Sequence, residues 1–234
     1  MKVNRKLDCL EDLRSRILTM AIAPGADLDE AVLSETYGVS RTPLREVLQR
    51  LAGEGYVTLT ENRGAKVASM DLPVVRAFFQ TAPLVYSSIA RLAAENRTVA
   101  QVDELKAIQT RFVRSVCAGR AGEIALENHR FHGMIGVMAV NDYLTPSLRR
   151  LLIDHTRLGQ IFYRPASPAE SLAVRISSDQ HDAMIAAIET GDSDGVVDLT
   201  LQHWALSRDR LERFVHPDPM PLDIADLKEW QHAI

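Results

Sequence analysis

The chain has 234 residues, enough for two modest domains, and 46% of them are hydrophobic, which excludes wholesale disorder. Aromatic residues make up only 6%, and Leu, Ala, Ile and Val dominate, which favours an all-helical protein. The formal net charge is −4, so bulk charge does not attract nucleic acid. Any contact with DNA must therefore come from a local basic face.

The sequence indicates no export signal and no membrane span. Charges such as Asp8, Glu11 and Arg14 break the N-terminal segment, so we expect no signal-peptide core, and no apolar run is long enough for a bilayer. Cys9 and Cys117 lie far apart and outside any CxxC pattern, which is typical of free thiols in a reducing compartment. We therefore expect a cytoplasmic protein with no membrane partner.

Two helices are expected at the start of the chain. Leucine and isoleucine recur at helical spacing over residues 7–18, and this helix should stop before Pro24. A second helix is predicted over residues 28–37. Asp27, with Glu30 three residues later, is the expected N-cap of that helix.

A third helix should begin near residue 41 after a tight turn. Gly38 can take the positive φ that ends one helix sharply, and Pro43 falls in the first turn of the next, where its missing N–H matters little. Hydroxyls at such a helix start can meet phosphates, and arginines can bind guanine edges. The side chains expected to contact DNA in this way are Ser40, Arg41, Thr42 and Arg45.

Two short strands over residues 56–60 and 65–68 are predicted after this third helix. The turn between them carries Arg63 and Gly64, which we expect at the tip of a DNA-contacting wing. Helix, helix, helix and hairpin in this order predict a winged helix-turn-helix. Each feature alone is weak, since arginines are usually solvated surface, but order and spacing together favour DNA binding.

The segment 38–46, Gly-Val-Ser-Arg-Thr-Pro-Leu-Arg-Glu, carries a resemblance to a known family. Together with Pro24-Gly25 before it and Arg63-Gly64 after it, it resembles the GntR family of bacterial transcription regulators. The resemblance covers nearly all of the first 70 residues. It implies operator contacts from the residues named above, and a homodimer on a palindromic operator, whose recognition helices lie about one helical turn apart.

The remaining chain predicts an antiparallel helical bundle. Pro83 should kink or split its first helix, Thr98 should cap the second, and no strand is expected. The expected helices cover residues 74–96, 98–119, 121–140, 142–163, 169–190 and 192–214. The fold class is thus mainly α, with a DNA-binding domain over 1–70, a helical effector-binding and dimerisation domain over 71–216, and a C-terminal tail over 217–234.

Three histidines and one amide form a candidate metal site. Asn128 and His132 are four residues apart and so share one helix face, while His181 and His203 lie among apolar positions of two later helices. If they converge, three neutral imidazoles and an amide oxygen can hold a divalent ion. The alternative for each histidine is a hydrogen-bonded core residue.

Residues 127–132, 181–192 and His203 resemble the effector-binding FCD domain of the FadR subfamily. The resemblance implies Asn128, His132, His181 and His203 as metal ligands, with zinc expected and nickel or manganese as alternatives. Asn128 stands where an aspartate is usual, so weaker metal binding is expected. His129 should face away from His132, and His155 is expected at the surface or in an effector role rather than as a ligand.

A second departure concerns the first bundle helix, where the family commonly carries an arginine and a Leu-Glu pair. Here Ala82 and Val85-Tyr86 occupy those positions. If that arginine normally binds an effector carboxylate, another cation must replace it. Arg157 and Arg164 are the candidates, with ordinary surface arginine as the alternative.

The sequence therefore favours a DNA-binding repressor that a small metabolite, expected to be a carboxylate, releases from its operator. Its partners would be double-stranded operator DNA, an organic acid and a second copy of the chain. Two alternatives remain open at this point. One is a metal-free regulator that binds its ligand directly, and the other is a metal-dependent hydrolytic enzyme built on His132, His181 and His203.

Overall fold

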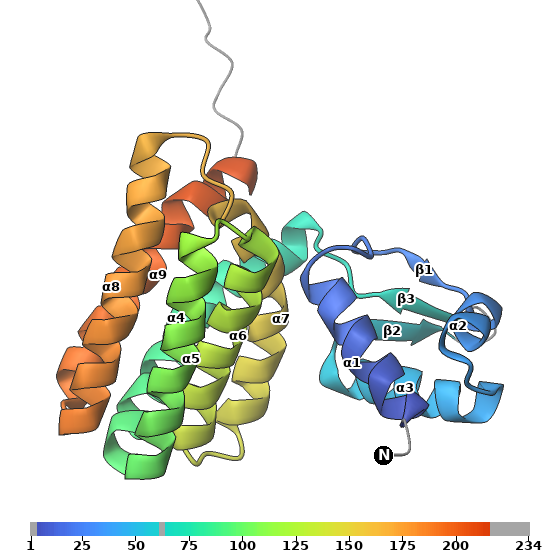
Figure 1. The fold of residues 1–234 in the computed structure, drawn as a ribbon, viewed down its shortest axis with the longest axis horizontal. Helices are drawn as coiled ribbons and strands as arrows, with labels where there is room; N and C mark the ends of the chain where they lie inside the picture. The colour runs from blue at the N-terminus through green and yellow to red at the C-terminus, as the bar shows by residue number, and fades with distance from the viewer. Residues whose placement is uncertain (1–3, 61–63, 216–234) are drawn as a thin grey trace, which may run out of the picture.

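The computed structural model describes residues 4–60 and 64–215, with 209–215 as backbone alone. Within these ranges the chain forms nine helices and three short strands, divided between a small mixed domain and a helical bundle (Figure 1). The predicted fold class is confirmed: a winged helix-turn-helix is followed by an antiparallel bundle. The predictions for Arg63 and for the tail over 217–234 fall outside the described residues.

The N-terminal domain wraps three helices and a small sheet around one apolar core. Leu13 of the first helix and Leu44 and Leu51 of the third are fully buried in it. Gly38 has φ +60° between the second and third helices, as the sharp turn requires. The elements are α1 (Arg5–Leu18), β1 (Asp27–Leu28), α2 (Glu30–Tyr37), α3 (Arg41–Glu54), β2 (Val57–Thr60) and β3 (Gly64–Val67).

The predicted cap of α2 at Asp27 is wrong. Asp29 is the N-cap, and its carboxylate accepts from Ala31 N at 2.7 Å and Val32 N at 3.1 Å. Asp27 instead belongs to β1, which pairs antiparallel with β3 in a sheet of order β1-β3-β2. The physical reason is that Leu28 is buried, so this short stretch is extended against the sheet before the helix begins.

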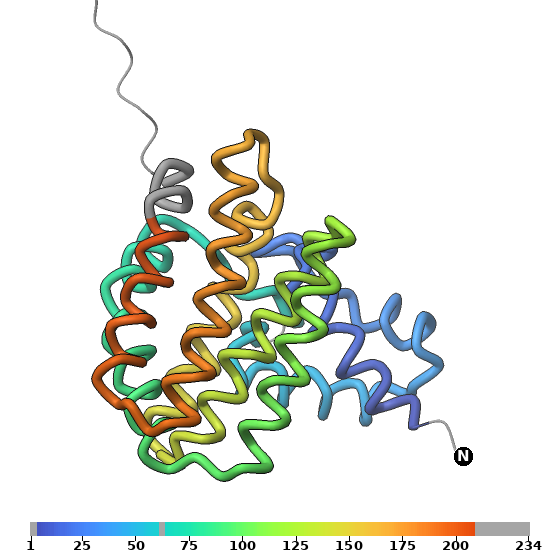
Figure 2. The backbone as a smooth tube through the Cα atoms, turned by 60° about the vertical axis from the view of Figure 1, so that its left-hand side comes forward, coloured from blue at the N-terminus to red at the C-terminus, as the bar shows by residue number. Residues whose placement is uncertain are grey.

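The bundle consists of six antiparallel helices in the described part of the chain. Its last helix lies along its first, as Figure 2 shows. Thr98 forms the expected capping box with Gln101, whereas Pro83 lies inside one continuous helix, so the predicted split does not occur. The helices are α4 (Leu72–Asn96), α5 (Val99–Cys117), α6 (Ala121–Met138), α7 (Leu144–Phe162), α8 (Pro168–Thr190) and α9 (Ser193–Val215).

Bilayer crossing requires a helix that is both long and apolar. No helix among residues 4–60 and 64–215 meets both conditions.

Helix α7 joins the two parts of the molecule. Ile153 packs into the core of the N-terminal domain. The fully buried guanidinium of Arg157 donates from Nη1 to the carbonyl oxygen of Ala68 at 2.7 Å, in the connector that precedes α4. Arg157 also pairs with Asp154, which Arg150 contacts at 2.7 Å. We call Asp154, Arg157 and the Ala68 carbonyl the hinge clamp.

Replacing Arg157 by Met should lower the free energy of unfolding by about 3 kcal/mol or more, because it leaves the Asp154 carboxylate and the Ala68 carbonyl without a buried partner. Urea unfolding of the full chain measures this change. Arg149→Met is the matched control: Arg149 is exposed on the same helix, and its loss should change stability by less than about 0.5 kcal/mol. Equal stability of the two variants would contradict the role of the clamp.

Candidate metal centre and nucleic-acid interface

The N-terminal end of α3 presents the polar side chains that the sequence predicts as DNA contacts. Ser40 is the N-cap residue, but its hydroxyl makes no capping hydrogen bond, so it can donate to or accept from an external group. Ser40, Arg41, Thr42 and Arg45 are all exposed. Arg45 pairs with Glu30 at 3.0 Å while 64% of its side chain stays exposed. Exposed surface pairs are weak, so this arginine can exchange its partner for a phosphate or a base.

The wing is placed by the pairing of β2 with β3. Thr60 faces Gly64 at the last position of the ladder, and Gly64 has φ +79°. Glycine adopts this left-handed conformation without strain. Gly64 therefore begins the strand that leaves the wing tip, where the backbone can approach DNA closely.

The three predicted histidine ligands converge inside the bundle. His132 on α6, His181 on α8 and His203 on α9 are buried, and one ring nitrogen of each lies within 4.8 Å of the others. Asn128 is one turn before His132 on the same helix and is 3% exposed. Three imidazoles from three helices thus meet at one point, and Asn128 precedes one of them by a single turn of α6.

Several polar atoms at this point have no partner in the described structure. The buried Oδ1 of Asn128 and the Nε2 atoms of His132 and His181 accept and donate no hydrogen bond. A buried polar atom without a partner typically costs about 1–3 kcal/mol. This set of oxygen and nitrogen atoms fits a divalent metal, for which each would supply a lone pair.

Two glutamines orient the rings of His181 and His203. The Gln109 amide donates from Nε2 to the carbonyl oxygen of Ser178 at 3.0 Å, so its Oε1 must accept from Nδ1–H of His181, also at 3.0 Å. Gln180 Oε1 lies 3.0 Å from Nδ1 of His203 in the same way. A proton on Nδ1 leaves Nε2 with its lone pair free, which is the tautomer that binds a metal through Nε2.

Burial keeps the imidazoles of the cluster neutral. Desolvation lowers the pKa of His203 to about 4 and lowers the pKa values of His132 and His181 well below the usual range. Phe131 stacks on His181 with ring centroids 3.8 Å apart. A neutral imidazole is the form that coordinates a metal.

The two histidines that the sequence sets apart from the cluster take different positions. Thr156 Oγ1 donates its one hydrogen to the Leu152 carbonyl oxygen, so His129 donates from Nδ1 to Thr156 Oγ1 at 2.8 Å, away from the cluster. His155 is buried rather than at the surface, and its Nδ1 lies 2.8 Å from the hydroxyl of Tyr86. Its ring centroid is 5.6 Å from that of His132. Because burial lowers the pKa of His155 to about 3, it adds a neutral polar group beside the cluster.

A small enclosed cavity adjoins the cluster. The space that the centre of a water-sized sphere can occupy in it is about 10 Å³. This is the smallest volume that can hold one water molecule. Its lining carries hydroxyls and imidazoles but no charged side chain: His155, Gly159, Phe162, Tyr163, Ser177, His203 and Ser207. As it stands the cavity can hold about one water molecule, and it can accept an organic ligand only if the helices move.

Neither predicted effector arginine lines this cavity. Arg157 belongs to the hinge clamp on the opposite face of α7. Arg164 is exposed just after α7 ends. Among the described residues the cluster and its cavity therefore contain no arginine, and the counter-charge for an anionic ligand has to come from elsewhere.

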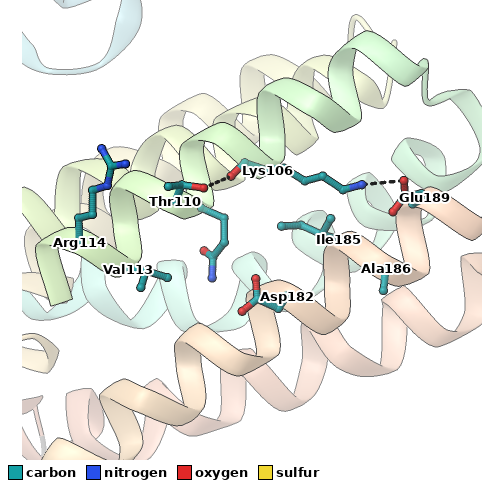
Figure 3. A pocket seen from close by; sticks show the side chains of 9 residues that line it. Lys106, Thr110, Val113, Arg114, Asp182, Ile185, Ala186 and Glu189 are labelled. Atoms are coloured by element: carbon teal, nitrogen blue, oxygen red, sulfur yellow. Dashed lines mark hydrogen bonds and ion pairs between the residues drawn. The ribbon is translucent and has the colours of Figure 1, made fainter. Parts of the chain in front are cut away.

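A separate open groove lies between α5 and α8. The space that the centre of a water-sized sphere can occupy in it is about 530 Å³. Figure 3 shows its two walls, with Lys106 on α5 paired with Glu189 on α8, and the Asp182 carboxylate facing the groove. Gln109 also lines the groove. This glutamine therefore separates the solvent-filled groove from the buried ring of His181.

Sequence reasoning missed the side chains that support the cluster. Gln109 and Tyr86 lie on α5 and α4, far in sequence from the histidines that they contact, and no local spacing reveals such pairs. Gln180 directly precedes His181, so its polar character at a helix position beside a candidate ligand was a usable signal. The hinge clamp was missed because Arg157 looks like surface arginine in the sequence.

The comparisons with known proteins agree on both parts of the chain. Residues 84–206 match the FCD domain, and residues 7–67 match the model of the bacterial regulatory proteins of the gntR family. The chain is 25% identical over 191 residues to the HTH-type transcriptional repressor RspR of Escherichia coli K12, with 82% of each chain covered. It is 39% identical over 89 residues to the fatty acid metabolism regulator protein of Proteus mirabilis, covering 37% of this chain and 34% of that one.

Solved structures show the same fold. Escherichia coli McbR/YncC matches with a TM-score of 0.71 and 22% identity, over 89% of this chain and 99% of that one. A GntR regulator from Rhodococcus sp. RHA1 matches with a TM-score of 0.65 and 16% identity, over 93% of this chain and 100% of that one. These names and domains describe transcriptional regulators rather than enzymes. With its helix-turn-helix and FCD domains both matched, the chain belongs to the GntR family of bacterial regulatory proteins.

Proposed function

We propose that this regulator binds a palindromic operator as a homodimer, represses transcription, and is released by a small carboxylate that binds at a divalent metal in the bundle. The observation that carries the proposal is the convergence of His132, His181 and His203 inside the bundle, where Nε2 of His132 and of His181 has no partner; the buried Oδ1 of Asn128, one turn before His132, has none either. A relative named a transcriptional repressor, with 82% of each chain aligned, supports the direction of the response.

The proposed DNA contacts come from the start of α3 and from the wing. Arg41 and Arg45 would bind base edges or phosphates, Ser40 and Thr42 would bind phosphates, and Gly64 would let the wing backbone approach the duplex. Two copies of α3 in a dimer would enter successive major grooves. With a net charge of −4, affinity would rest on these few contacts and on their spacing.

The proposed metal ligands are Asn128, His132, His181 and His203, with zinc favoured by the three imidazoles and nickel or manganese as alternatives. When bound, the ion would supply a positive charge for an anionic effector. Gln109 and Gln180 would hold the imidazoles in the ligating tautomer. The cavity hydroxyls of Ser177 and Ser207 would position the effector beside His203.

Release would proceed through α7. His155, Gly159 and Phe162 line the cavity on one face of this helix, while Ile153 and Arg157 contact the N-terminal domain and the connector on another. A ligand that displaces α7 would move the hinge clamp and so change the spacing of the two recognition helices. An allosteric coupling of about 1–3 kcal/mol would lower operator affinity roughly 5- to 150-fold.

A metal-free regulator is the second candidate function, because Asn128 is a weaker ligand for a dication than a carboxylate. In that case the same buried atoms would bind the organic effector directly.

Arg45→Ala should weaken operator binding by about 1–3 kcal/mol per half-site, roughly 5- to 150-fold, because a guanidinium fork on a base edge or phosphate is lost. Fluorescence anisotropy on an operator selected in vitro with the wild-type protein measures the change. Arg50→Ala is the matched control, since Arg50 is exposed at the other end of the same helix, where it pairs with Glu54. Equal losses in both variants would show that α3 does not bind DNA through its N-terminal end.

Supplied with excess zinc and a small carboxylate and then freed of unbound metal, the protein should contain about one equivalent of zinc per chain by elemental analysis, and His132→Ala should contain almost none, because a three-histidine site rarely survives the loss of one ligand. His129→Ala is the control, since this neighbouring histidine bonds Thr156 instead and its loss should leave the metal in place. Wild-type protein that takes up no metal even from excess would favour the metal-free regulator.

A further inference from the structure

We infer that Asn128 makes the bundle site electrically neutral, so that a metal ion is retained tightly only together with a small carboxylate anion. This inference rests on the proposed metal site and concerns how that site would be regulated. On this inference the metal ion and the effector bind cooperatively. The metal ion is then not a cofactor that stays bound while the effector comes and goes.

The proposed donor set carries no net charge. Asn128 offers an amide oxygen, and His132, His181 and His203 offer neutral imidazoles, so the four donors carry no negative charge. The metal-ligand cluster among the described residues contains no aspartate, glutamate or cysteine. A divalent ion placed there would keep its full charge of +2 in a buried environment, where an uncompensated charge is unfavourable.

The buried carboxylates of the described chain are already paired with cations. Glu127 and Asp154 are the two buried carboxylates in that part. Glu127 is held by Arg111 and Arg130, and Asp154 is held by Arg150 and by Arg157 in the hinge clamp. Both are therefore neutralised by cations that they already contact.

The carboxylates next to the ligands in sequence point outward. Asp182 directly follows His181, but it is exposed and faces the open groove between α5 and α8 (Figure 3). Asp179, two residues before His181, is exposed as well. The protein thus supplies the site with donors but with no compensating charge.

The cavity beside His203 has the chemistry for an anion. It is enclosed, has no acidic lining residue, and carries the hydroxyls of Ser177 and Ser207. Each hydroxyl now donates to a backbone carbonyl of its own helix, Val174 and Trp204 respectively, and can turn to donate to a ligand. With room for about one water, the cavity admits even the smallest carboxylate only when the surrounding helices move, so binding of the anion is coupled to such a movement.

The probe is formate, with formamide as its uncharged counterpart of the same size. Zinc is titrated into the metal-free full-length protein at neutral pH, in a zwitterionic buffer with perchlorate as the only small anion, and free zinc is read with a competing chromophoric chelator. We expect formate to tighten zinc binding at least about tenfold and formamide to leave it unchanged. By linkage, zinc should tighten formate binding by the same factor.

Two variants separate charge from ligation. Asn128→Asp places the missing charge in the site, so it should bind zinc at least about tenfold more tightly than the wild type without formate, and formate should then add little. Asn128→Ala removes a donor but keeps the site neutral, so zinc binding should weaken under every condition while the formate effect persists. Circular dichroism verifies folding, and the Ala variant alone still tests the inference if the Asp variant does not fold.

Equal zinc affinity of the wild type with and without formate would overturn the inference and leave the proposed metal site intact. Loss of the formate effect in Asn128→Ala would also overturn it. If neither the wild type nor Asn128→Asp binds zinc under any condition, the proposed metal site is itself wrong and the inference falls with it.

Discussion

The buried guanidinium of Arg157 fixes how the two parts of this regulator sit together. It ties α7 to the Ala68 carbonyl in the connector and to Asp154, where no water can replace these bonds. The opposite face of the same helix forms a wall of the cavity beside the histidine cluster, through His155 and Gly159. A helix moves as a rigid rod. A displacement of α7 at its cavity face therefore also displaces the residues on its opposite face, which contact the connector. The proposed effector site and the DNA-binding domain therefore share one structural element.

This arrangement suits a protein that holds DNA with few contacts. The net charge is −4, and basic groups near the recognition helix already have acidic neighbours, as in the pairs Arg45–Glu30 and Lys66–Asp27. Little non-specific attraction then remains to keep the protein on DNA when the recognition helices lose their spacing. Under the proposed mechanism a modest movement of α7 would be enough to release such a regulator, whereas a strongly basic protein would stay bound.

The fold and the convergence of the three histidines were largely predictable because helix boundaries and inward-facing positions follow from local patterns. Helical periodicity and turn glycines gave the element order, and the pair Asn128 and His132 lies four residues apart on one inward face. What the sequence does not reveal is long-range pairing. Gln109 contacts His181 across two helices, and Arg157 reaches a carbonyl 89 residues away. The β1 strand was missed because two residues are too short to show the alternation of a strand, and Asp27 resembles a helix cap.

Hydrogen–deuterium exchange of the full-length protein, with and without zinc and formate, tests the shared role of α7 most directly. We expect ligand binding to change exchange in α6, α8 and α9 around the cluster, in α7, and also in the connector around Ala68 and at the end of α1. Such a pattern follows only if α7 transmits the change through the hinge clamp. Changes confined to α6, α8 and α9, with α7 and the connector unaffected, would contradict this account.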